Sequence, residues 1–289
     1  MLEGYAIPGV LVDTDWVAEH LDDHSVVTVE VNTDLQAGYD QGHVPGAVGW
    51  GLHTDLEDQT RRDIASLSQM EGLLGRSGID NDTTVVLYGD GNNRSATYAF
   101  WVLKYYRHGD VRLMDGGRQR WLDEGRPLTT DPPTPEAKSY RGGIPDRTLR
   151  ATRDHILSNL RSSSMRLLDT RTEEEYRGTL SSAPGTTQAD IYRSGRIPGA
   201  VLLPWDEGAT GDGTFKPADE LRRMYLDKGV SPDQEVIVYC RLGVRASYSW
   251  FVLKYLLGYE RVRNYDGSWT EWGNSVGVPI ETDASQAML

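Results

Sequence analysis

The chain has 289 residues, of which 43 are acidic and 30 are basic, so its formal net charge at neutral pH is −13. Such a charge argues against nucleic acid or an anionic membrane surface as a partner. No segment approaches the ~20 apolar residues of a membrane span. The amino-terminal residues also lack the basic-then-apolar pattern of a secretory signal peptide. The single cysteine leaves no possibility of an internal disulfide, which is typical of a reducing compartment, so we expect a cytoplasmic protein.

This length suits one large domain or two ordinary ones, and an internal repeat favours two. Three motifs occur twice in the same order, and the later two recur at an offset of 151 residues, from Tyr88 to Tyr239 and from Asp115 to Asp266. The motifs occupy residues 42–48, 85–105 and 111–121 in the first copy and 195–201, 236–255 and 262–272 in the second. The sequence therefore predicts two copies of one domain.

The repeat also sets the expected domain boundaries. The first domain covers residues 1–130 and the second covers residues 148–289. Residues 131–147 are polar and begin in a proline-rich stretch, which predicts an extended linker. The second copy carries an additional segment, residues 178–195, whose Ser, Gly, Thr and Pro content predicts a surface loop.

Strands and helices are predicted to alternate within each copy. In the second copy, the hydrophobic pattern predicts strands and helices alternately at residues 165–169, 217–226, 235–239, 246–257 and 262–265. This alternation favours an α/β fold in which each domain is a parallel sheet with helices on both faces. In such sheets, ligands bind beyond the carboxyl ends of the strands.

Cys240 lies at one of these strand ends. It follows the apolar segment 235–239, and a short loop with a glycine and two arginines leads from it into the next helix. Loop N–H groups, the positive end of a helix and two guanidinium groups all favour the thiolate over the thiol. We therefore expect Cys240 to be the catalytic nucleophile.

The residues after the cysteine indicate an anionic substrate. Arg241 and Arg245 supply charged donors for an oxyanion, and Gly243 allows the backbone to approach the ligand closely. Two chemistries fit: phosphate ester hydrolysis through a phosphocysteine, and sulfur transfer through a persulfide. Cysteine-dependent phosphatases share a Cys-x5-Arg loop, whereas only four residues separate Cys240 from Arg245. The smaller loop favours sulfur transfer.

The chain resembles the tandem-domain rhodaneses, the thiosulfate sulfurtransferases, over essentially its whole length. The resemblance rests on Tyr-x3-His-Val-Pro-Gly-Ala at 39–47, on Cys-Arg-Leu-Gly-Val-Arg at 240–245 and on the segment 262–272. It implies two rhodanese domains, of which only the second is catalytic. The alignment of the repeats agrees, because Gly89 stands opposite Cys240 and is followed by Asp90.

The resemblance also implies a mechanism without cofactor or metal. The anionic sulfur donor thiosulfate gives its outer sulfur to Cys240, and cyanide or a thiol accepts that sulfur from the persulfide. Well-known members have donor-binding basic residues where this chain has Glu175 and Leu242, and Arg245 and Arg171 are the expected substitutes. Two alternatives remain: a 3-mercaptopyruvate sulfurtransferase, which Arg241 disfavours, and a non-catalytic sulfur-binding rhodanese module.

Overall fold

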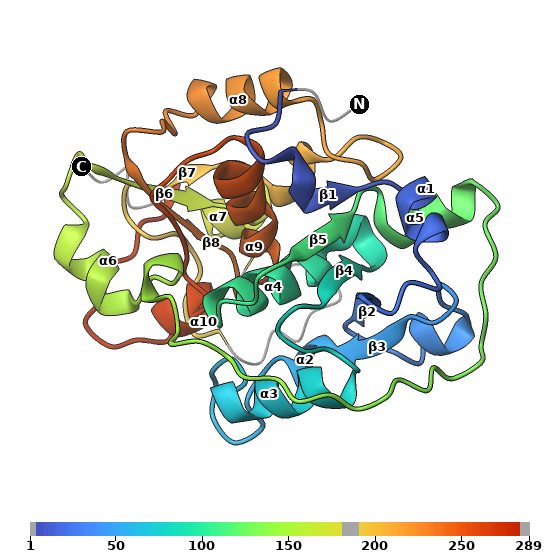
Figure 1. Ribbon diagram of the computed structural model, residues 1–289. Helices are drawn as coiled ribbons and strands as arrows, with labels where there is room; N and C mark the ends of the chain where they lie inside the picture. The colour runs from blue at the N-terminus through green and yellow to red at the C-terminus, as the bar shows by residue number, and fades with distance from the viewer. Residues whose placement is uncertain (1–3, 181–190, 284–289) are drawn as a thin grey trace.

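In the computed structural model, which describes residues 4–180 and 191–283, the chain forms two parallel β-sheets flanked by helices (Figure 1). The first sheet has the order β1-β5-β4-β2-β3. Its strands are β1 (Leu11–Val12), β2 (Val26–Asn32), β3 (Val48–Gly51), β4 (Thr84–Tyr88) and β5 (Val111–Met114). The helices of this domain are α1 (Thr14–Glu19), α2 (Leu52–Asp55), α3 (Leu67–Arg76), α4 (Asp90–Tyr105) and α5 (Gly117–Asp123), with 3-10 turns η1 (Pro8–Val10) and η2 (Tyr39–Gln41).

The second sheet has the order β7-β6-β8-β9 and is also parallel. Its strands are β6 (Met165–Asp169), β7 (Val201–Leu202), β8 (Glu235–Tyr239) and β9 (Val262–Asn264). The helices are α6 (Arg153–Asn159), α7 (Glu173–Arg177), α8 (Ala218–Asp227), α9 (Val244–Phe251) and α10 (Ser268–Trp272), with 3-10 turns η3 (Arg147–Leu149) and η5 (Trp205–Gly208) and a π-helical turn η6 (Val252–Leu256). The predicted α/β class with two parallel-sheet domains is confirmed.

The repeat is visible in the strand registers. In the first sheet β2 lies beside β4 with Glu30 opposite Tyr88, and in the second β6 lies beside β8 with Asp169 opposite Tyr239. The helix predicted over 246–257 begins two residues earlier, at Val244, and its last turn is π-helical. It begins early because Gly243 adopts a left-handed conformation and caps the helix there.

The two domains share one hydrophobic core. Helices α4 and α9 pack against each other at the domain interface, and Phe100 of α4 contacts the rings of Trp250 and Phe251 of α9. All three side chains are fully buried, and the core continues from them into both domains. An interface of this kind holds two domains in one fixed orientation.

Segments at the domain ends extend this interface. Near the N-terminus, the N–H of Ala6 donates to the carbonyl of Leu256 and Tyr5 Oη donates to the carbonyl of Lys216, so this part of the first copy packs on the second domain.

The segment 131–146 contains no helix or strand and runs along the outside of the first domain (Figure 1). Most of the predicted loop 178–195, namely residues 181–190, lies outside the described residues.

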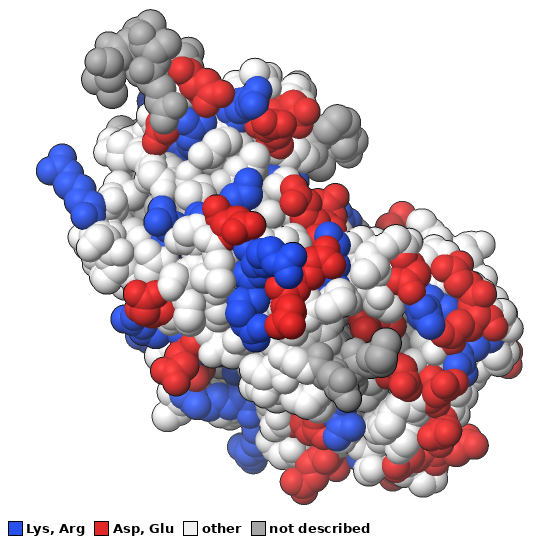
Figure 2. All heavy atoms as spheres, turned by 90° about the horizontal axis from the view of Figure 1, so that it is seen from above, with Lys and Arg blue, Asp and Glu red and all other residues white. Residues whose placement is uncertain are grey.

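The surface reflects the acidic composition. Figure 2, which looks down on α8, shows acidic and basic side chains interspersed over this face, with acidic ones gathered toward one end. Across the described residues, the structure has no helix with the length and apolar character needed to cross a bilayer.

Candidate active site

Cys240 follows the last residue of β8, at the carboxyl end of the second sheet. The side chain is 1% exposed. The N–H of Gly243 points at the sulfur, with 3.1 Å between N and Sγ, and the N–H of Cys240 itself donates to Ser268 Oγ at 3.0 Å. The sulfur is therefore held inside a short loop by a backbone donor, an arrangement suited to a negatively charged sulfur.

Gly243 is required by the shape of this loop. It has a φ of +86°, and a Cβ atom on it would lie 2.5 Å from Cα of Asp266. No side chain fits at that distance from a backbone atom. The carbonyl of Gly243 also accepts from the side-chain amide of Asn264 at 3.1 Å, so β9 positions the backbone that faces the sulfur.

Helix α10 holds the other side of the loop. The N–H of Trp269 donates to the carbonyl of Cys240 at 3.0 Å, and Thr270 donates to the carbonyl of Arg241 through both its N–H, at 3.1 Å, and its hydroxyl, at 2.8 Å. The Arg241 side chain itself is half-buried. The motif 262–272 therefore forms the outer wall that fixes the loop after Cys240.

Arg245 lies in the first turn of α9 and binds a carboxylate. Its Nη1 and Nη2 donate to the two oxygens of Glu175 at 2.7 and 2.9 Å, and Glu175 is fully buried. Burial acts to lower the pKa of Arg245, but the hydrogen bonds that Arg245 donates to Glu175 and the charge of Cys240 raise it. Burial by itself would raise the pKa of Glu175, but the hydrogen bonds and the charge of Arg245 hold the pKa of that carboxyl below its usual value. Both groups are charged.

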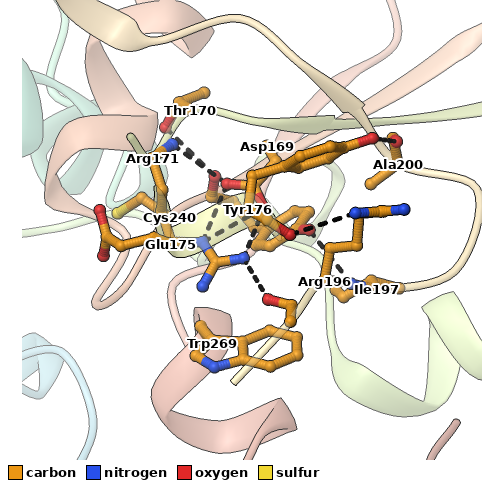
Figure 3. A network of polar contacts seen from close by, with 12 residues as sticks. Asp169, Thr170, Arg171, Glu175, Tyr176, Arg196, Ile197, Ala200, Cys240 and Trp269 are labelled. Carbon is orange, nitrogen blue, oxygen red and sulfur yellow. Dashed lines mark hydrogen bonds and ion pairs between the residues drawn. The ribbon is translucent and has the colours of Figure 1, made fainter. Parts of the chain in front are cut away.

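Arg171 is buried in the second domain. Its guanidinium forms a bidentate pair with Asp169 at 2.7–3.2 Å, donates to the carbonyl of Gly195 at 2.7 Å and lies over the ring of Trp269 (Figure 3). Its side chain is 0% exposed, and Nη1 has no hydrogen-bond partner among the described residues. Arg171 is thus paired with Asp169, the last residue of β6.

Arg94 approaches this region from the first domain, and the sequence did not single it out as a candidate site residue. It belongs to the first domain, where it is the repeat counterpart of Arg245, and its guanidinium carbon lies 5.9 Å from the ring centre of Trp205 in the second domain. Burial and then the charge of Arg245 lower the pKa of Arg94, while the charge of Cys240 acts in the opposite direction. The available signal was the repeat itself, since equivalent segments of two repeated units often meet at their interface.

The corresponding loop of the first domain contains no reactive group. A Cβ atom on Gly89 would lie 2.5 Å from the carbonyl oxygen of Val31, so the backbone there excludes any side chain, including that of cysteine. The side chain of Asn93 turns into the loop, accepts from the N–H of Gly89 at 3.0 Å and donates to the carbonyl of Met114 at 2.7 Å. The Asn93 amide therefore ties this loop to the end of β5.

A cavity of about 920 Å³ lies between the domains beside the active loop. It is bordered by Leu242 of the loop, by Gly267 and by residues from both domains, among them Tyr98, Arg150 and Asp63. Arg150 spans it by pairing with Asp63 of the first domain and with Asp266 of the second, which stands in the wall behind Gly243. In the described parts of the chain, no group of three His, Cys, Asp or Glu side chains is placed to hold a metal ion.

Comparison with known proteins agrees with this geometry. The family model described as "Rhodanese-like domain" matches residues 13–124 and 152–275. Among curated relatives, "Sulfur carrier protein TtuD" of Thermus thermophilus is 51% identical over 280 residues, covering 96% of this chain and 98% of the relative. A Mycobacterium leprae protein named "Putative thiosulfate sulfurtransferase" is 46% identical, covering 94% of this chain and 97% of the relative.

A solved structure is also similar. The anaerobic ergothioneine biosynthesis enzyme from Chlorobium limicola, in complex with trimethyl histidine, is 26% identical with a TM-score of 0.86, covering 96% of this chain and 71% of that one. The fold and the cysteine loop define a two-domain protein of the sulfurtransferase class. The chain belongs to the rhodanese-like family and contains that domain twice.

Proposed function

We propose that this protein is a thiosulfate sulfurtransferase that carries sulfur as a persulfide on Cys240. The observation that carries the proposal is the buried sulfur of Cys240 with the N–H of Gly243 directed at it from 3.1 Å. A loop that holds one sulfur atom against a backbone donor suits an enzyme that adds a second sulfur there. The names of two relatives, "Putative thiosulfate sulfurtransferase" and "Sulfur carrier protein TtuD", support the same chemistry.

The first half-reaction forms the persulfide. The Cys240 thiolate attacks the outer sulfur of thiosulfate, a new S–S bond forms, and the bond between the two sulfurs of thiosulfate breaks. Sulfite leaves with the electron pair of that bond, and the negative charge on the enzyme passes to the terminal persulfide sulfur. Arg241 and Arg245 bind the sulfonate, and Arg171 contributes through its Nη1. Gly243 stabilises the charged sulfur through its N–H.

The second half-reaction returns the enzyme to its starting state. A nucleophile, either cyanide in an assay or a thiol in the cytoplasm, attacks the terminal sulfur of the persulfide. The S–S bond to Cys240 breaks, its electron pair returns to the cysteine as a thiolate, and thiocyanate or a new persulfide leaves. The kinetics are therefore of the ping-pong type, and the reaction needs neither a metal nor an organic cofactor.

Intact-mass measurement after incubation with thiosulfate tests the proposal. The wild-type protein should gain one sulfur atom, lose it again on addition of cyanide, and release one thiocyanate per cycle. Cys240→Ser should gain none, and it serves as the matched control because serine retains the size of the side chain. Equal labelling of both proteins, or labelling of neither, would refute the assignment.

Donor comparison separates the proposal from its alternatives. A higher kcat/KM with 3-mercaptopyruvate than with thiosulfate would identify the protein as a mercaptopyruvate sulfurtransferase. A stable persulfide that no thiol or cyanide removes would identify a non-catalytic sulfur-binding module. We expect thiosulfate to be the better donor, because Arg241 follows the cysteine directly and places a guanidinium group beside the donor site.

A further inference from the structure

The charges around Cys240 are largely cancelled within the second domain. Arg245 is paired with the buried carboxylate of Glu175, and Arg171 is paired with the buried carboxylate of Asp169. Thiosulfate carries two negative charges, and each arginine–carboxylate pair is close to neutral as a unit. A dianion therefore gains little net attraction from these two arginines.

Arg94 enters the same region from the first domain. It lies at the amino-terminal part of α4, close enough to Arg245 and Cys240 for their charges to act on it, and its guanidinium faces the ring of Trp205. The position is held by the packing of α4 on α9, including a 3.1 Å hydrogen bond between Thr97 and Ser247 across the interface.

Unlike Arg171 and Arg245, Arg94 has no carboxylate of its own. Among the described residues no Asp or Glu forms an ion pair with it, and its half-buried side chain has no hydrogen-bond partner there. The charges that act on Arg94 are those of another cation, Arg245, and of Cys240. A half-buried cation in this position has no carboxylate partner among the described residues, and the oxyanion of a ligand would supply an equivalent one.

The repeat explains why the carboxylate is missing. Tyr176 Oη donates to the carbonyl of Ala200, and Tyr39 Oη donates to the carbonyl of Ala47, both at 2.7 Å, so the two tyrosines occupy equivalent positions. The residue before Tyr176 is Glu175, which binds Arg245. The residue before Tyr39 is Gly38. The first domain thus keeps the arginine of this pair and lacks its carboxylate.

We propose that Arg94 binds the sulfonate group of the sulfur donor, so that the first domain completes the active site of the second. This inference rests on the proposed thiosulfate sulfurtransferase activity and assigns one determinant of its specificity for anionic donors. A guanidinium group offers two parallel N–H donors to sulfonate oxygens. As the S–S bond of thiosulfate breaks, negative charge accumulates on the departing sulfite, and Arg94 stabilises that charge as well.

Single-turnover kinetics of Arg94→Gln test this role. Persulfide formation with thiosulfate should slow by about 10- to 100-fold in kcat/KM, the range of a lost charge-assisted hydrogen bond. When the persulfide is preloaded from an organic persulfide that carries no sulfonate, both its formation and its release to cyanide should be unchanged, because Arg94 then has no sulfonate to bind. Arg94→Lys, which keeps the charge but not the two-donor geometry, should recover part of the rate.

Arg76→Gln is the matched control. Arg76 is also a first-domain arginine, but it is exposed on α3 and pairs with Asp55 of its own domain. It should leave both half-reactions unchanged. The thermal midpoint of Arg94→Gln should stay within a few degrees of wild type, which distinguishes lost donor binding from a disturbed domain interface.

A binding measurement removes the dependence on turnover. Sulfate, an unreactive dianion, should bind to Cys240→Ser, and adding Arg94→Gln should weaken that binding about 10-fold or more by calorimetry. Equal sulfate affinity together with an equal thiosulfate rate in Arg94→Gln would overturn the inference while leaving the proposed function intact. Failure of the wild-type protein to accept sulfur from thiosulfate would instead overturn the proposed function.

Discussion

Glu175 and Arg245 form a buried bidentate ion pair beside the loop that follows Cys240, with N···O distances of 2.7 and 2.9 Å. The pair joins α7 to the first turn of α9 and places a carboxylate near a sulfur that is expected to receive an anion. The carboxylate of Glu175 weakens the attraction of Arg245 for an anionic donor, but it also fixes the orientation of the guanidinium group.

Glu175→Gln should uncouple these two effects. The variant loses a buried ion pair, so we expect a loss of about 3 kcal/mol in unfolding free energy at neutral pH. It also leaves Arg245 without its countercharge, so KM for thiosulfate should fall severalfold. Chemical denaturation and donor kinetics measure the two outcomes. Glu174→Gln, one residue away and exposed, should alter neither, and an unchanged KM in Glu175→Gln would contradict this role.

The stability difference between wild type and Glu175→Gln should also depend on pH. Because the folded pKa of Glu175 lies below its unfolded value, the ionised carboxylate contributes stability that is present above the unfolded pKa and disappears as the pH falls through the folded one. The two proteins should therefore differ at neutral pH and converge in acid. Urea titrations at several pH values would detect this, and a constant difference would exclude it.

Gly243→Ala should abolish most of the activity. The φ of +86° disfavours any residue with a Cβ, and the new methyl group would lie 2.5 Å from the backbone of Asp266. The loop must then shift, and the N–H aimed at Cys240 moves with it. We expect a loss of about 100-fold or more in kcat/KM. Gly72→Ala, in open space on α3, should be at least as active and stable as wild type.

Arg171→Ala distinguishes substrate binding from structural support. The variant leaves the fully buried Asp169 without its partner, which should lower the unfolding free energy by about 3–5 kcal/mol. If Nη1 also contacts the donor, KM for thiosulfate should rise as well. Asp169→Asn with Arg171→Met removes both charges and should recover stability but not donor affinity. Recovery of both would exclude a donor contact.

Asp115 is expected to make the stability of the domain interface pH-dependent. It accepts the N–H of Phe215 at 3.0 Å across the interface, and burial raises the pKa of Asp115 to about 6 from an ordinary value of 3.8. Because the folded carboxyl holds its proton more tightly than the unfolded one, stability should fall as pH rises from about 4 to about 6 and remain lower above that. Asp115→Asn removes this ionisation.

The expected gain for Asp115→Asn above pH 6 is on the order of 3 kcal/mol, with little difference from wild type near pH 4. Thermal unfolding across this range measures it, and a gain that persisted at pH 4 would point to another cause. Asp227→Asn, exposed at the end of α8, should show no such pH dependence.

Much of the fold followed from local patterns in the sequence. The repeat identified two domains, and the apolar segments predicted β6 and β8 with their observed bounds. Cys240 follows β8 and therefore lies at the carboxyl end of the sheet, because in a parallel sheet the loops that follow the strands all lie at that end. These features depend on residues close together in the chain, whose hydrogen bonding and burial leave a periodic trace.

The pairing of charged side chains at the site could not be predicted from such local patterns. By itself the sequence determined the repeat, the sheet class and the position of Cys240. Only the tertiary structure decided that Arg245 is paired with Glu175, that Arg171 is paired within the sheet end, and that Arg94 approaches from the other domain. The pair between Arg245 and Glu175 joins residues that are 70 positions apart in the chain, and Arg94 reaches the site from the other domain. No local period in the sequence records contacts of this kind.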